Sequence, residues 1–384
     1  MGYYQYMAKE KNYYTISNSI SNFLELFDEG KIVESLKELD ANAKNTRFLQ
    51  VTNPIASSLI AGCGYNGNKL VLNQTRPVRN SDYMYFILTA SLLKLLKKEL
   101  KKSPNYLDEL YSALFSRSAG PALTKISELT AAGYYKEQGK RVQLNSSKEE
   151  GMPDVYLPEE EFATDVKSFP NNDARLGDAL NECRKEAGEL FKLIKDTDIL
   201  FFIHDPDRKH IQAALAEITK DLRDTGSINQ DYGAISTLVV DDSYKAAELV
   251  IEIGETNSRL HFQSNWALDN AVDGLDDLLE KSVEQSSKAN KQAVTWVWFP
   301  GDAANHAIQM NVVRYVTGLH GKVENNESLD GVVCYSISAV EENKTSIASD
   351  VYGHKLQQYG ITKDNVNEFL EKHLSMKEYL IHRS

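Results

Sequence analysis

Two aspartates and one lysine occur in an order that could support hydrolysis of a phosphodiester. Asp154 is followed after ten residues by Asp165, and Lys167 comes two residues after that. Side chains at i and i+2 project from one face of a β-strand, so Asp165 and Lys167 are expected to lie together. If the strands on either side of residues 158–160 pair across a turn, Asp154 reaches the same strand end. Two carboxylates then converge beside one ammonium group.

This combination of groups suits metal-dependent hydrolysis. Two carboxylates, a backbone carbonyl and water are suitable ligands for Mg²⁺, which prefers octahedral oxygen coordination and keeps several waters. A lysine does not bind the metal. Its ammonium can stabilise the charge that develops on a phosphate, or help to position and deprotonate the attacking water.

The motif resembles the signature of the PD-(D/E)xK nuclease superfamily, which includes type II restriction endonucleases. The matching residues are a Pro-Asp pair ending at Asp154, a ten-residue gap and an Asp-Val-Lys triplet, with Glu128 in a preceding helix. The resemblance implies that Asp154 and Asp165 bind Mg²⁺ and that Val166 offers its carbonyl. It also implies that Lys167 assists hydrolysis and that Glu128 belongs to the catalytic site.

The predicted elements around the motif follow the order of that superfamily: a helix with a glutamate, a strand, a hairpin, a crossover helix and a further buried strand. The apolar spacing predicts a helix at 121–136, strands at 142–144, 154–157, 162–169 and 199–203, and helices from 173 and from 209. The resemblance covers about residues 115–225. The expected fold is α/β, a restriction-endonuclease-like mixed sheet flanked by helices.

Both ends of the chain extend beyond this core. Residues 1–114 are predicted to form a mainly helical N-terminal region, in which an amphipathic segment at 84–102 ends before Pro104. Residues 226–384 are predicted to form an α/β C-terminal region for DNA recognition or dimerisation. The apolar runs of this region could build a second sheet or extend the first one. The polar stretch 224–233 is the best candidate linker.

Composition narrows the class of protein. The 384 residues include 43 Lys and Arg and 55 Asp and Glu, a net charge of −12, which does not exclude a local basic surface. Basic residues outnumber acidic ones between Arg76 and Arg141, as either a solvated helix face or a surface that faces phosphates. Three widely spaced cysteines, no signal peptide and no long apolar run predict a cytoplasmic protein without a membrane segment.

Other candidate sites are interpreted as structural. The segment 204–210 could be a metal cluster but reads more simply as a loop with a helix N-cap. The tryptophans at 296 and 298 and Phe299 are expected in the core, with base stacking as the alternative. The remaining candidates, interpreted as surface groups, are His306, His320, His354 and the turn glutamates Glu159, Glu160 and Glu161.

The sequence therefore predicts a Mg²⁺-dependent endonuclease that cleaves duplex DNA in the manner of a restriction enzyme. A homodimer is expected, because a C₂ dimer matches the two strands of a duplex. One alternative is a non-catalytic nucleic-acid-binding module with a nuclease-like fold, and another is a protein-interaction scaffold. The third is a solvent-facing hairpin whose acids and lysine only solvate an edge strand.

Overall fold

The computed structural model divides the chain into two compact units. Residues 1–37, 53–169 and 272–384 form the first unit, and residues 38–52 and 170–271 form the second. The residues that the structure describes are 19–46, 53–72, 80–147, 152–168, 183–194, 197–204, 207–240, 249–252, 259–264, 292–300, 329–340, 344–353 and 355–374.

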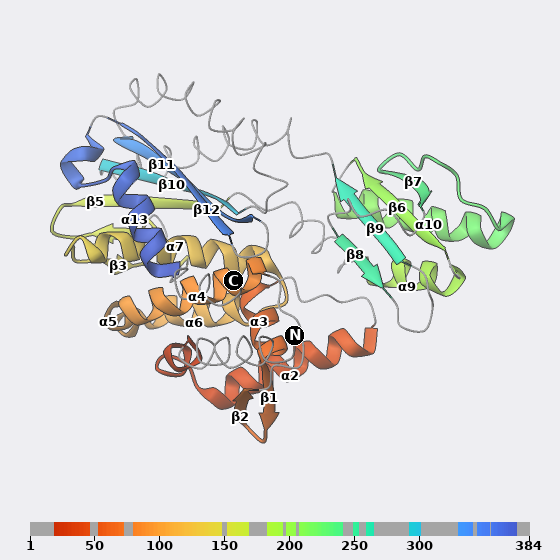
Figure 1. The fold of residues 1–384 in the computed structure, drawn as a ribbon, viewed down its shortest axis with the longest axis horizontal. Helices are drawn as coiled ribbons and strands as arrows, with labels where there is room; N and C mark the ends of the chain where they lie inside the picture. The colour runs from red at the N-terminus through yellow and green to blue at the C-terminus, as the bar shows by residue number, and fades with distance from the viewer. Residues whose placement is uncertain are drawn as a thin grey trace, which may run out of the picture. The chain divides into compact units, whose positions relative to one another are not determined.

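A mixed six-stranded sheet forms the centre of the first unit (Figure 1). Its strand order is β12-β11-β10-β5-β4-β3. The three inner strands β11, β10 and β5 are parallel, whereas the pairs β11–β12, β5–β4 and β4–β3 are antiparallel. The fold is thus mixed α/β, which confirms this much of the expected fold class. The strands are β3 (Gln143–Leu144), β4 (Val155–Leu157), β5 (Phe162–Ser168), β10 (Gln292–Pro300), β11 (Gly331–Val340) and β12 (Lys344–Tyr352).

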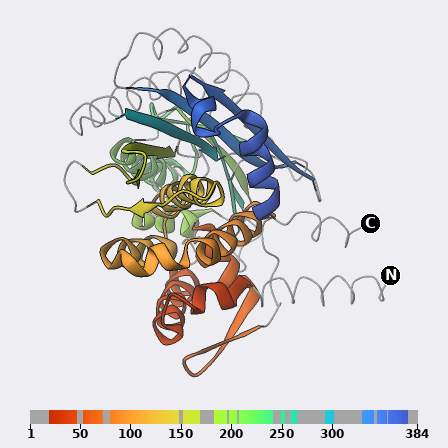
Figure 2. The ribbon, with the colours of Figure 1, turned by 90° about the vertical axis from the view of Figure 1, so that its left-hand side faces the viewer.

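Three helices cover one face of this sheet (Figures 1 and 2). Helix α7 (Ala119–Glu137) packs on β4, β5 and β10, and it contacts α4 (Asn80–Leu95), which reaches β11. Helix α13 (Lys363–Leu374) packs on β12 and on α4, and a 3₁₀ turn η2 (Leu356–Tyr359) precedes it. The predicted helix at 121–136 is therefore present as α7.

Two tryptophans of β10 fill the layer between this sheet and these helices. Trp296 and Trp298 are fully buried and, being two residues apart in a strand, point to the same face. The Nε1 of Trp296 donates a hydrogen bond to the Tyr135 hydroxyl at 2.9 Å. The ring of Trp298 stacks on Tyr335, with centroids 5.9 Å apart. These contacts confirm the core interpretation of both tryptophans, whereas the Phe299 side chain lies outside the described part.

The described residues of the N-terminal part of the first unit lie mainly in helices. The proline at 104 separates two helices, because it lacks an N–H and is tolerated only in a first helical turn. Helix α5 ends at Lys102 and α6 begins at Pro104. The predicted segment 84–102 also divides at Leu96, between α4 and α5. The elements of this part are α2 (Glu29–Thr46, of which residues 38–46 belong to the second unit), α3 (Pro54–Gly62), β1 (Cys63–Asn66), β2 (Lys69–Leu72), α5 (Lys97–Lys102) and α6 (Pro104–Leu114).

The second unit contains a separate four-stranded sheet with the order β7-β6-β9-β8. Strand β6 pairs parallel with β9 and antiparallel with β7, and α9 and α10 pack together beside a core that includes Phe201 and Ile211. The elements are α9 (Arg184–Leu193), β6 (Asp198–Ile203), α10 (Arg208–Thr225), β7 (Ile235–Val240), β8 (Leu249–Glu252) and β9 (Arg259–Ser264).

The predicted core of residues 115–225 includes the buried strand at 199–203, but this strand, β6, lies in a different sheet from the motif. The parallel neighbour of β5 in the motif-bearing sheet is β10, and β6 belongs to the second unit. The division also differs from boundaries at 114 and 225, because most of the second unit, residues 170–271, lies between β5 and β10 in the sequence. Of the apolar runs after residue 226, β7, β8 and β9 build the second sheet, whereas β10, β11 and β12 extend the first.

A buried histidine ties α13 to α4 and α7. His373 Nε2 lies 2.7 Å from Glu137 Oε1, and its Nδ1 lies 2.7 Å from the hydroxyl of Ser91. A neutral imidazole can donate from Nε2 to Glu137 and accept from Ser91 at Nδ1. Burial lowers the pKa of His373, and Lys372 adds to this effect, although Glu137 acts in the opposite direction.

Acidification is expected to destabilise the wild type more than His373→Gln. The lowered pKa means that the unfolded state binds a proton more readily, so folding stability falls as the pH drops below about 6.5. Urea unfolding at about pH 7.5 and about pH 5.5 measures this difference. His204→Gln, at an exposed histidine bonded to Ser236, serves as the control and should keep the pH dependence of the wild type. An equal pH dependence in His373→Gln would contradict the assignment.

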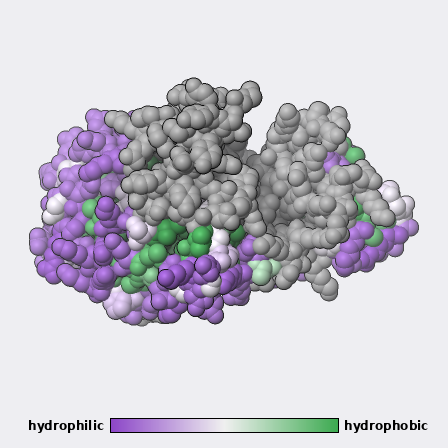
Figure 3. Space-filling model, turned by 60° about the horizontal axis from the view of Figure 1, so that its bottom comes forward, coloured by the Kyte–Doolittle hydropathy of each residue, from purple (hydrophilic) through white to green (hydrophobic). Residues whose placement is uncertain are grey.

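The described surface is mostly hydrophilic in the view of Figure 3. The large apolar side chains that are exposed in the described part are Val71, Met152, Leu193, Leu238 and Val239. Among the helices that the structure describes, none combines the length and the apolar composition needed to cross a bilayer.

Candidate active site

The β4–β5 hairpin brings the two predicted aspartates together. Val155 pairs with Thr164 at the open end of the hairpin. One residue further along the same register, Asp154 lies opposite Asp165. Directly opposed residues of an antiparallel pair have neighbouring side chains on one face. The predicted hairpin and its turn are thereby confirmed.

Asp165 and Lys167 lie on the face of the sheet that is turned away from α7. Their alternating neighbours face α7, because Thr164 bonds to Tyr135 and Ser168 lies 3.1 Å from the Thr124 hydroxyl. The Lys167 Nζ lies 3.0 Å from Oδ1 and 2.8 Å from Oδ2 of Asp165, so the ammonium sits on both carboxylate oxygens. The predicted juxtaposition of these two side chains is therefore present.

Asp154 occupies the edge of β5 beyond the end of β4. Its Oδ2 accepts a hydrogen bond from the Val166 N–H at 2.8 Å. The pKa of Asp154 lies well above its usual value, first because the carboxyl is buried and then because of the charges of Glu128 and Asp165. A hydrogen bond with the Asp165 carboxyl raises it further, whereas the Val166 N–H acts against the shift. The site thus contains more acidic groups than its cations neutralise.

Glu128, in helix α7, interacts electrostatically with Asp154. Its side chain projects from α7, and the residue is 3% exposed. Its Oε2 accepts a hydrogen bond from Lys125 Nζ at 2.8 Å. Burial raises the pKa of Glu128 even though Lys125 opposes the shift. The structure therefore places Glu128 within electrostatic range of Asp154.

Glu128 is surrounded by three further residues, which the interpretation of the sequence did not include in the site. Lys125 lies between two carboxylates, 2.8 Å from Glu128 and 3.3 Å from Glu109, and its Nζ lies 4.5 Å from the centre of the Tyr106 ring. Burial and then the charge of Glu128 raise the pKa of Tyr106. The Tyr106 hydroxyl also interacts with the Glu128 carboxyl by a hydrogen bond that raises the pKa of Tyr106. The available signal was the spacing of three between Lys125 and Glu128 on one helix.

Glu109 anchors the start of the motif region to α6. Its carboxylate accepts hydrogen bonds from the Ser146 hydroxyl at 2.6 Å and from the Ser147 hydroxyl at 2.8 Å. Burial acts to raise its pKa, but these hydrogen bonds and Lys125 outweigh burial and lower the pKa to about 2. Glu109 is therefore a fixed negative charge next to Lys125.

The donor set fits Mg²⁺ held by few protein ligands. In the described part of the chain, no three His, Cys, Asp or Glu side chains converge to hold a metal ion. Mg²⁺ commonly uses one or two carboxylates and completes its coordination with water and substrate phosphate. Asp154 and Asp165 supply those carboxylates, and the Val166 carbonyl shares the strand edge of the Val166 N–H. The surplus of acidic groups also fits a hydrated cation.

Comparisons with known proteins add no relative. No protein-family model matches the sequence, and neither the curated proteins nor the solved structures gave a significant match.

The other candidate sites have structural roles where they are described. Asp207 caps α10 by accepting from the Lys209 N–H at 2.8 Å, which confirms the loop interpretation of this segment. Glu160 pairs with Lys140 at 2.7 Å in the turn of the hairpin. The positions that lie outside the described residues are Asp205, His306, His320 and His354.

Proposed function

We propose that this protein is a Mg²⁺-dependent endonuclease that hydrolyses DNA phosphodiester bonds, with a restriction-endonuclease-like core. The main support is the hairpin that sets Asp154 opposite Asp165, with Lys167 on the same carboxylate. A buried and a half-buried carboxyl group beside an ammonium group have the donors for a divalent cation and a positive charge for the phosphate. The helix with Glu128 and the parallel neighbour β10 complete the arrangement.

Each side chain has a defined part in this proposal. Asp154, Asp165 and the Val166 carbonyl would hold the ion, which lowers the pKa of its bound water and stabilises charge on the phosphate. The Val166 N–H fixes the orientation of Asp154, because it donates to Oδ2 at 2.8 Å. Lys167 presents its ammonium beside Asp165, where it neutralises negative charge on the scissile phosphate. Glu128 keeps the surroundings of Asp154 acidic, which favours uptake of a cation in place of a proton.

The substrate in this proposal is duplex DNA, cleaved in the manner of a restriction enzyme in the cytoplasm. Two strands must be cut, and one copy of the chain supplies one set of Asp154, Asp165 and Lys167. A homodimer with a two-fold axis would place one such set at each strand.

Incubation with plasmid and phage DNA is expected to give cleavage in Mg²⁺ and none in EDTA. Asp165→Ala should abolish cleavage, because it removes a metal ligand and the partner of Lys167. Lys167→Ala should reduce cleavage at saturating Mg²⁺. Asp108→Ala is the matched control, since Asp108 is exposed on α6 and should leave cleavage at the wild-type level.

The same assay distinguishes the alternatives. Salt-dependent DNA binding without cleavage would support the non-catalytic module. Neither binding nor cleavage would favour the scaffold. Cleavage that persists in Asp165→Ala would exclude the proposed site while leaving a nuclease elsewhere in the chain.

A further inference from the structure

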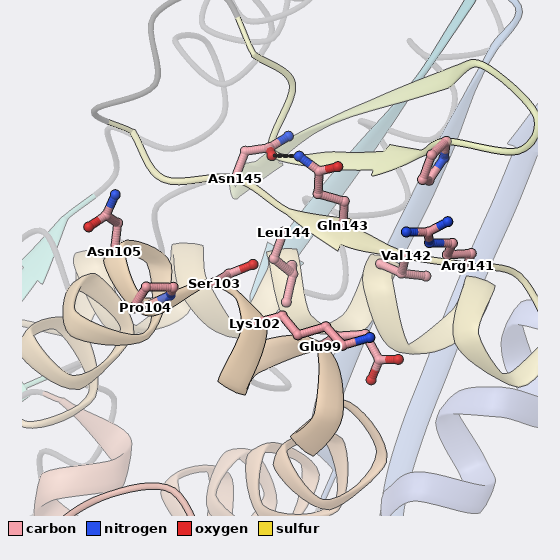
Figure 4. A pocket seen from close by; sticks show the side chains of 11 residues that line it. Glu99, Lys102, Ser103, Pro104, Asn105, Arg141, Val142, Gln143, Leu144 and Asn145 are labelled. Atoms are coloured by element: carbon pink, nitrogen blue, oxygen red, sulfur yellow. Dashed lines mark hydrogen bonds between the residues drawn. The ribbon is translucent and has the colours of Figure 1, made fainter.

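A polar pocket of about 320 Å³ opens beside the hairpin, between α5, the start of α6 and strand β3 (Figure 4). It is distinct from the carboxylate cluster of the candidate active site. Its polar lining comes mainly from Lys102, Ser103, Asn105, Arg141, Gln143 and Asn145.

Two side-chain amides in the pocket wall are fixed by hydrogen bonds. Gln143 Nε2 donates to Asn145 Oδ1 at 2.8 Å, the contact drawn in Figure 4. Asn145 Nδ2 in turn donates to the Pro153 carbonyl at 2.7 Å. A primary amide has two N–H donors and one carbonyl acceptor, so Gln143 retains a donor and its acceptor for a ligand. Such a pair suits the hydrogen-bonding edge of a nucleobase.

The pocket also has an excess of positive charge. Lys102 and Arg141 are exposed, and neither has an ion pair among the described residues. The one acidic lining residue, Glu99, is paired with Lys136 at 2.6 Å. The Ser103 side chain makes no capping hydrogen bond at the N-terminus of α6, so it does not satisfy the first-turn N–H groups of this helix. These groups favour a phosphate.

The pocket is connected to the candidate active site through the backbone. The Asn145 N–H donates to the carbonyl of Asp154 at 3.2 Å, and the Asn145 side chain holds Pro153. A small molecule bound against Gln143 and Asn145 is therefore adjacent to residues 153–154, which include the proposed metal ligand Asp154. Tyr106, next to Asn105 in the sequence, interacts with Glu128 and with Asp154.

We infer that this pocket binds one nucleotide of the substrate, next to the bond that is cleaved. Arg141 and Lys102 contact its phosphate, and Gln143 contacts the edge of its base. The volume lies at the lower end of small-molecule sites, which span about 300–1,000 Å³, and so suits a single nucleotide. The placement beside the scissile bond rests on the proposed nuclease function, whereas nucleotide binding does not.

The test is calorimetric titration of the full-length protein in EDTA with a deoxynucleoside monophosphate, with inorganic phosphate and with a nucleoside. The monophosphate is expected to bind more tightly than either fragment. Arg141→Ala should weaken its binding about tenfold or more, because a guanidinium binds phosphate bidentately. Lys102→Ala should weaken it less, and Gln143→Leu should reduce the preference for the nucleotide over phosphate. Lys98→Ala, at an exposed lysine of α5 outside the pocket, should bind as the wild type does.

A labelled DNA duplex then separates the two sources of a nucleotide. If the pocket serves nucleic acid, the duplex displaces the monophosphate, and Arg141→Ala reduces the slope of log affinity against log salt by about one. No binding of the monophosphate by the wild type, or equal binding by Arg141→Ala, would overturn the inference even if plasmid is cleaved. Nucleotide binding without any plasmid cleavage would instead overturn the nuclease function and leave the pocket as a nucleotide site.

Discussion

Asp154→Asn is expected to reduce Mg²⁺-dependent cleavage by at least about 10³-fold and to raise the stability of the metal-free protein. The loss follows because an amide is a poor ligand for Mg²⁺ and carries no charge. The gain in stability follows because Asn reproduces the protonated form of Asp154. In the wild type the Val166 N–H donates to Asp154 Oδ2 at 2.8 Å, and the carbonyl of Asn can accept the same hydrogen bond. The NH₂ of Asn can donate to Asp165.

The stability gain should depend on pH in a defined direction. Burial, then Glu128 and Asp165, raise the pKa of Asp154 in the folded state, so the folded protein binds a proton more tightly than the unfolded chain. The contribution of Asp154 to wild-type stability must then fall as the pH rises above about 3.9, the usual aspartate value, and level off above the folded pKa. Because Asn does not ionise, the advantage of the variant should be small near pH 4 and grow toward neutral pH.

Thermal unfolding in EDTA across this pH range, together with plasmid cleavage, measures both effects. A rise of about 2 °C or more at neutral pH is expected. Asp108→Asn, at an exposed site on α6, should change neither quantity. An Asp154→Asn protein that is less stable than the wild type at neutral pH would contradict the raised pKa of Asp154. One that still cleaves DNA would contradict its role as a metal ligand.

The motif could be predicted from the sequence because it depends on local geometry alone. A period of two sets Asp165 and Lys167 on one face, and a short turn folds Asp154 back against them. The hairpin needs no information from distant parts of the chain. This explains why the register Val155 to Thr164 and the Asp165–Lys167 contact match the expectation.

The neighbour of the hairpin could not be predicted in the same way. Strand β6 and strand β10 both appear in the sequence as continuous apolar runs, and strands close in sequence usually lie close in space. That tendency favoured β6. The chain instead builds the second unit between β5 and β10, and only tertiary packing, such as Trp296 on Tyr135, distinguishes the two strands.

The residues that surround Glu128 could not all be predicted from the sequence, for a related reason. Lys125 could be associated with Glu128 by helical spacing, but its second partner, Glu109, is on another helix. The meeting of α6 and α7 is a tertiary contact. The charge balance of the site therefore depends on a helix that carries no part of the motif.

Lys125→Met is expected to destabilise the protein by about 3 kcal/mol. The Lys125 side chain is 13% exposed and lies between the carboxylates of Glu109 and Glu128. Methionine fills a similar volume but leaves the nearly buried Glu128 without a cation and near Asp154, whose pKa is already raised. Glu128→Gln should destabilise the protein less than Lys125→Met. The glutamine carbonyl can still accept a hydrogen bond from Lys125, and the substitution removes a buried negative charge.

A double-mutant cycle identifies the interaction. If Lys125 acts through Glu128, the double variant should be more stable than the sum of the single effects predicts, with a coupling of about 1 kcal/mol or more. Urea unfolding at neutral pH gives the four free energies of unfolding. The matched control is Glu189 and Lys192, a pair with the same spacing on α9 whose side chains are 36% and 71% exposed. Lys192→Met should cost no more than about 0.5 kcal/mol, because exposed ion pairs contribute little.

The comparison of the two lysines decides whether Lys125 is part of the acidic cluster. Equal costs for Lys125→Met and Lys192→Met would mean that Glu128 is solvated or protonated and does not depend on Lys125. A much larger cost for Lys125→Met, relieved by Glu128→Gln, would mean that α7 carries a built-in cation that keeps its glutamate charged. Asp154 would then have an ionised neighbour, and the acidic cluster would favour a divalent ion over a proton at neutral pH.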